Sequence, residues 1–196
     1  MSARAAALAL GGGLVAGVVM SFGQTVAPEP IAPLFNSAAP VVALAAAVAL
    51  AGRGALTHVL FGASAGPLAM VGYYATTHLR GFGVSLQMVA FWSVAGVVSG
   101  AAMGLAVWAL RRRAAPAWRV PAAALFPGVA IGEAAHGLVR ISDTTPAAYW
   151  AGLALLGAVI LAWLARSFLD TTLQRTLAVG FTAAAAAALF VLYGVA

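Results

Sequence analysis

Cysteine and lysine are both absent from this chain of 196 residues. Without cysteine there can be no disulfide, no thiolate metal site, no iron–sulfur cluster and no covalently attached haem. Without lysine no Schiff base can form, which excludes a retinal-type photoreceptor. We therefore expect no cofactor.

Charge is scarce as well, because only 7% of the residues are charged while 64% are apolar. A water-soluble domain of this size needs a surface that is roughly a quarter charged. Lipid must therefore be the solvent for most of the chain. The arginines sit singly or in one short cluster between apolar runs. That placement is typical of membrane anchoring, and we expect the bilayer, not nucleic acid, as the partner.

Seven apolar segments are long enough to be spanning helices, which need about 20 residues to cross about 30 Å of hydrocarbon. The second contains Pro33 and Pro40, so a short helix preceded by a re-entrant stretch stays open for it. The first is longer than most signal-peptide cores, and we expect it to be retained. The segments lie near Ala5–Phe22, Ile31–Ala51, Gly54–Tyr74, Ser85–Leu110, Val120–Leu138, Ala147–Ala165 and Leu177–Val195.

Arginine placement predicts the orientation of these segments. If all seven cross, one side receives only Arg80 and Arg140. The other side receives Arg4, Arg53, Arg111, Arg112, Arg113, Arg119, Arg166 and Arg175. Cytoplasmic loops carry the excess of positive charge, so the amino terminus is predicted in the cytoplasm and the carboxyl terminus outside. Residues 1–196 are expected to form a single integral domain, an all-α polytopic bundle of about seven helices in a bacterial cytoplasmic membrane.

Glycines spaced four apart predict the helix-packing surfaces. The fourth segment carries Gly96, Gly100 and Gly104, and the fifth carries Gly128 and Gly132. Small residues let helix backbones approach closely in lipid, where little hydrophobic force acts between helices. Two interpretations stay open: packing within the bundle, or docking of one strip onto a second copy or another membrane protein.

Glu133 is the most informative polar residue, because a carboxyl group inside an apolar helix is costly and needs a partner. His136 and Arg140 follow at spacings of three and seven, so the three share one helix face toward the outer side. By topology, Gln24, Asn36, Tyr73 and Tyr74 gather at the same level. These seven residues are the candidate ligand-binding set. The alternative is a structural network in which Glu133 bonds Arg140 or a tyrosine hydroxyl.

Two classes of function follow from these features. The first is a small-molecule binding or transport subunit with an outward-facing polar pocket. The second is a structural or accessory subunit that packs through its glycine strips. No catalytic residue and no metal site is predicted, because no motif spacing such as HxxxH is present. An enzyme is the least favoured class.

Several short stretches resemble an uncharacterised family of multi-pass membrane proteins that is common in actinobacteria. They are Ala32–Ser37, Gly72–Tyr74, Phe91–Trp92 followed by the glycine strip and the arginines, and Gly132–Glu133. The resemblance implies a small membrane protein and no particular activity. In size and layout the chain also resembles, more loosely, the substrate-binding subunits of vitamin transporters, which have six helices and a pocket that opens outward.

Overall fold

The computed structural model describes residues 3–194, with side chains described for Ala7 and from Gly11 onward, and within that part of the chain there are eight helices and no strand. The predicted all-α class is confirmed. Val195 and the side chain of Arg4 lie outside the described residues. The helices are α1 (Ala3–Val26), the 3-10 helix η1 (Glu29–Asn36), α2 (Ala38–Ala49), α3 (Ala55–Leu79), α4 (Leu86–Arg111), α5 (Pro116–Arg140), α6 (Ala147–Phe168) and α7 (Thr172–Tyr193).

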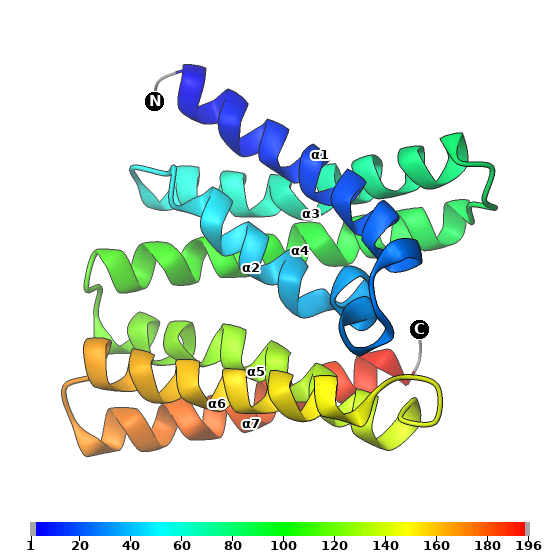
Figure 1. Ribbon diagram of the computed structural model, residues 1–196. Coiled ribbons are helices and arrows are strands. Elements are labelled where there is room, and N and C mark those ends of the chain that lie inside the picture. The colour runs from blue at the N-terminus through cyan, green and yellow to red at the C-terminus, as the bar shows by residue number, and fades with distance from the viewer. Residues whose placement is uncertain (1–2, 195–196) are drawn as a thin grey trace.

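The helices form two groups that lie side by side (Figure 1). One group contains α1, α2, α3 and α4, and the other contains α5, α6 and α7. Helices α2 and α4 both contact α5 and so join the groups. Helices α1, α3, α5 and α7 run in one direction and α2, α4 and α6 in the other, and α1 begins at the end of the bundle opposite to that where α7 finishes (Figure 1).

Five helices, α3 to α7, are long and apolar enough to cross a membrane. The pair η1 and α2 passes the same test together but is bent by 56°, so it counts as a sixth span only if it is one broken span. Helix α2 alone has 12 residues, and at about 1.5 Å per residue it covers about 18 Å, too little to cross. The second expected segment is therefore a half-length helix preceded by a separate short one.

The glycines expected to pack helices lie in two seams inside the bundle. Gly96 faces Gly66, and a Cβ added at Gly100 would overlap the carbonyl oxygen of Gly62. Gly104 lies equally close to the backbone of His58. The fourth-helix strip thus packs against α3 and not outward. Gly128 and Gly132 form the second seam, between α5 and α7, against Ala185 and Ala186.

Arginines hold the end of the bundle where the α2–α3, α4–α5 and α6–α7 connections lie, on the left in Figure 1. Arg111 donates to the carbonyl of Leu50 at 2.8 Å, and Arg112 donates to that of Arg53 at 2.7 Å. The Leu50 carbonyl lies at the end of α2, where a helix leaves carbonyl groups without an internal partner, and the Arg53 carbonyl lies in the α2–α3 connection. These residues therefore have a structural role in addition to the orientation signal expected from the sequence.

The same end carries an ion pair between Arg119 and Asp170, 2.7 Å apart. Arg119 is 7% exposed and also donates to the carbonyl of Phe168, the last residue of α6. The hydrogen bond and the charge of Arg119 hold the pKa of Asp170 below its usual range. Arg175 adds two bonds to the carbonyl of Leu169. Arginines from α5 and α7 thus meet at the end of α6.

Substituting Gly100→Ala is expected to destabilise the protein by about 1–3 kcal/mol, the usual cost of overpacking a close contact. The added methyl group would meet the backbone of α3, which cannot move aside as a side chain can. Denaturation of the purified protein in detergent measures the effect. The matched control is Gly180→Ala, where a Cβ meets nothing within 4 Å. Equal stability of the two variants would contradict the close packing of Gly100 against α3.

Candidate functional site

The carboxyl group of Glu133 lies buried between three helices and is only 3% exposed. One oxygen accepts from the backbone N–H of Ala38 at 2.6 Å and from the Tyr193 hydroxyl at 2.9 Å. The other accepts from the backbone N–H of Ala39 at 2.8 Å and from the Ser37 hydroxyl at 2.6 Å. Four donors around two oxygens match the ionised carboxylate.

This carboxylate lies at the start of the half-length helix α2. The first N–H groups of a helix have no partner within the helix, and in lipid no water replaces it. Ser37, in the capping position, makes no capping bond of its own. Glu133 takes the N–H groups of Ala38 and Ala39, and Pro40 has none to satisfy. An anion is also favoured there by the helix dipole. Glu133 thus lets α2 begin away from water.

Aromatic rings enclose the same carboxylate. His136 stacks on Tyr193, with ring centroids 4.8 Å apart, and Tyr149 of α6 lies near Ser37 and Glu133. The His136 Nδ1 atom and the Tyr149 hydroxyl are buried without a hydrogen-bond partner among the described residues. We call the group of Glu133, Ser37, His136, Tyr149 and Tyr193 the cage; within it the carboxylate is buried and accepts four hydrogen bonds.

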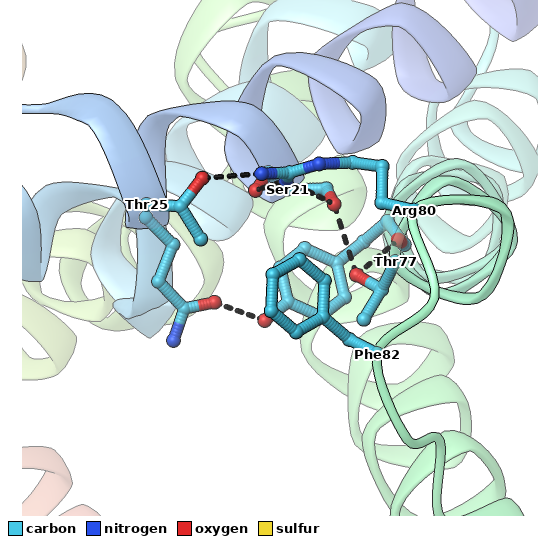
Figure 2. A pocket seen from close by; sticks show the side chains of 7 residues that line it. Ser21, Thr25, Thr77, Arg80 and Phe82 are labelled. Carbon is cyan, nitrogen blue, oxygen red and sulfur yellow. Dashed lines mark hydrogen bonds between the residues drawn. The ribbon is translucent and has the colours of Figure 1, made fainter.

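A separate polar hollow of about 310 Å³ opens between α1, α3 and the turn after α3 (Figure 2). Its lining residues are Ser21, Gln24, Thr25, Tyr73, Thr77, Arg80 and Phe82. Polar residues recur four apart on both helices, at Ser21 and Thr25 and at Tyr73 and Thr77, so each pair shares one helix face. The Ser21 and Thr77 hydroxyls are 2.9 Å apart, and Tyr73 donates to Gln24.

Arg80 spans this hollow from the end of α3. It donates to the Ser21 carbonyl and to the Thr25 hydroxyl on α1 (Figure 2). Its guanidinium carbon lies 4.4 Å from the Phe22 ring centroid and 5.2 Å from that of Phe82, within range of cation–π attraction. Gly81, with φ of 81°, reverses the chain after α3 and brings Phe82 to this position.

The structure divides the predicted ligand-binding set between these two places. Gln24 and Tyr73 line the hollow, and Tyr74 packs edge-on against Tyr73 with centroids 5.0 Å apart. Glu133 and His136 belong to the cage. Asn36 is exposed at the end of η1. The structural alternative gave Glu133 either Arg140 or a tyrosine hydroxyl as its partner. The structure shows the hydroxyl of Tyr193.

Arg140 does not take part in that network. Its side chain is exposed and lies over Phe190, with its guanidinium carbon 5.8 Å from the ring centroid. The described residues contain a single ion pair, between Arg119 and Asp170. The spacing of seven residues from Glu133 put Arg140 on the same helix face, but two helical turns carry it past the carboxylate to the rim of the bundle.

Sequence reasoning missed most of the hollow. Ser21, Thr25 and Thr77 were not singled out, and Arg80 was treated only as an outer-side arginine. The spacing of four between polar residues on α1 and on α3 was the available signal. Tyr193, which donates to Glu133 from α7, is likewise not among the predicted residues. Among the described residues, no group of three histidine or acidic side chains lies close enough to hold a metal ion.

These features define a class: an all-helical, apolar bundle with at least five helices able to cross a membrane, a broken helix pair and a polar hollow at one end. The chain belongs to the Family of unknown function (DUF6518), whose family model matches residues 1–196. The resemblance to an uncharacterised family is confirmed. No curated protein and no solved structure matches the chain.

Glu133→Gln is expected to lower the free energy of unfolding by about 3 kcal/mol, since two or more charge-assisted bonds are lost. Tyr193→Phe removes one bond and should cost about 1 kcal/mol. Denaturation in detergent measures both. Glu29→Gln is the control, because Glu29 is the other glutamate and is exposed. A Glu133→Gln variant as stable as the Glu29→Gln control would show that the cage contributes nothing.

Proposed function

We propose that this protein binds a small polar molecule at the outer face of a bacterial cytoplasmic membrane, in the hollow between α1 and α3. The observation that carries the proposal is the gathering of seven mostly polar side chains around an open space at the end of long apolar helices. Ligand sites are concave and hold a few convergent polar groups that fix the ligand's orientation.

The proposal places the hollow outside the cell. Arg53, Arg112 and Arg113 lie in connections at one end of the bundle, where Arg111 ends α4, while the turn containing Arg80 lies at the other end. Excess arginine marks the cytoplasmic side. Reporter fusions are expected to put the Arg111–Arg113 turn in the cytoplasm and the Gly81–Gly83 turn outside. The opposite assignment would place the hollow inside the cell and overturn this part of the proposal.

The hollow is favoured over the cage for a physical reason. The Glu133 carboxylate is 3% exposed and already accepts four hydrogen bonds, so a ligand would have to displace all of its partners. The lining residues of the hollow also bond one another, but they border an open space of about 310 Å³ that a small molecule can enter.

Transport is the extension of this proposal. Broken helices occur at the binding sites of many membrane transporters, and η1 with α2 forms such a break. Helix α1 links the two places, since Gly23, next to Gln24, lies against the ring of Phe35 in η1.

An accessory subunit is the alternative function. That hypothesis used the glycine strips as docking surfaces, but Gly96, Gly100 and Gly104 pack against α3. A partner would have to meet another face, such as the outer face of α7, which exposes Leu173, Leu177 and Phe181. Lipid covers such a face equally well, so the observations favour the binding function.

Binding is tested by thermal stabilisation of the protein in lipid nanodiscs with a panel of small polar molecules. A molecule that stabilises the wild type should lose its effect in Tyr73→Phe, which removes a hydroxyl from the hollow. It should keep its effect in Tyr193→Phe, which removes a hydroxyl from the cage. Loss of the effect only in Tyr193→Phe would move the site to Glu133, and a panel without any stabilising molecule would remove the proposed function.

A further inference from the structure

The hollow contains a cation and no anion. Arg80 is its single charged lining residue. The four acidic residues of the chain are Glu29, Glu133, Asp143 and Asp170, and none of them lines it. Among the described residues, the one arginine in an ion pair is Arg119. A half-buried guanidinium at the edge of a membrane is costly without a counter-charge, because burial removes water that its protein partners only partly replace.

The neighbours of Arg80 leave two of its five N–H donors for a further partner. Phe22 and Phe82 lie within cation–π distance of the guanidinium, at 4.4 and 5.2 Å. A guanidinium has five N–H donors in one plane, and three bonds to Ser21 and Thr25 are present. The planar edge of a guanidinium matches the paired oxygens of a carboxylate or phosphate group.

Gln24 and the two phenylalanines suit the same ligand. The hydroxyls of Thr25, Tyr73 and Thr77 already donate to the Phe22 carbonyl, to Gln24 and to the Tyr73 carbonyl. The amide N–H groups of Gln24 can donate to the oxygen atoms of a ligand. Phe22 and Phe82 are 47% and 50% exposed, so they offer an apolar surface directly beside the charged centre.

Resting on the proposed function, we infer that the hollow binds an oxyanion, a carboxylate or phosphate group, at the Arg80 guanidinium, with the apolar part of the ligand against Phe82. Two sources share this chemistry. One is a free anionic solute outside the cell, and the other is the headgroup of an anionic phospholipid in the outer leaflet.

The experiment measures thermal stabilisation in nanodiscs of pure phosphatidylcholine at constant ionic strength. The probes are benzoate, inorganic phosphate and the neutral molecule benzamide. A parallel set of nanodiscs contains phosphatidylglycerol and no added solute. Stabilisation by benzoate or phosphate identifies a free oxyanion, and stabilisation by phosphatidylglycerol alone identifies a lipid headgroup. Either result supports the inference.

Variants assign the effect to Arg80. Arg80→Gln should weaken binding of the effective anion about tenfold or more, since a charge-assisted pair contributes about 1.5–3 kcal/mol. Arg80→Lys keeps the charge and should retain part of the binding, which guards against simple misfolding of the first variant. Arg140→Gln is the matched control, because Arg140 also lies beside a phenylalanine but outside the hollow. Its anion response should equal that of the wild type.

Three results would overturn the inference. Benzamide could stabilise as well as benzoate with no effect of Arg80→Gln, in which case the hollow binds neutral molecules and the proposed function survives alone. Arg140→Gln could abolish the response as fully as Arg80→Gln does, which would indicate general surface charge. The third result is that none of the anions, lipids or neutral probes stabilises the protein. In that case the binding function fails together with the inference.

Discussion

The contact between the Glu133 carboxylate and the first turn of α2 is the interaction on which the rest of the structure depends. A chain in hydrocarbon must pair every backbone donor and acceptor internally. A helix that begins at a bend breaks this rule at its first turn, unless another element supplies acceptors. Glu133 supplies both of its oxygens to the N–H groups of Ala38 and Ala39. The cost of an acidic residue in an apolar helix is thereby offset by the backbone groups that it satisfies.

This contact also joins the two groups of helices. Glu133 belongs to α5, its backbone partners to α2, and its hydroxyl partner Tyr193 to α7. Apolar packing joins the same two groups of helices, because Ala39 of α2 packs with Ala130 and Ala134 of α5. At the opposite end of the bundle the groups without a partner are carbonyls at the ends of helices. Arg111 and Arg119 donate to them. Glu133, Arg111 and Arg119 thus each bond the backbone at a helix end.

Composition and segment length were sufficient to predict the class of fold and the position of the helices. The reason is that spanning helices depend on long apolar runs, which are visible along the chain. Pro33 and Pro40 marked the second segment as irregular, and the break falls at Ser37 between them. The spacing of glycines predicted close helix contacts. Spacing within one helix could not show which neighbour each strip meets, and only the three-dimensional crossing of α3 and α4 identifies that partner.

The polar residues were harder to interpret for the same reason. Glu133, His136 and Arg140 share a helix face by their spacing, yet only the first two lie in the cage. The donors to Glu133 come from residues between 60 and 96 positions away in the sequence, so local periodicity carries no information about them. The hollow around Arg80 similarly needs α1 and α3 to lie side by side before its polar residues meet. The helix face on which each polar residue lies could be predicted from the sequence, but the pairing of helices could not.

Hydrogen exchange at the amides of Ala38 and Ala39, in nanodiscs, tests the central claim most directly. The first-turn amides of a helix ordinarily exchange readily because nothing in the helix bonds them. If Glu133 holds them, the wild-type amides are protected, and Glu133→Gln accelerates their exchange about tenfold or more, as loss of about 1.5 kcal/mol predicts. The amides of α4 at the Gly100 seam should keep their protection in both proteins. Equal exchange at Ala38 and Ala39 in the wild type and the variant would contradict the claim.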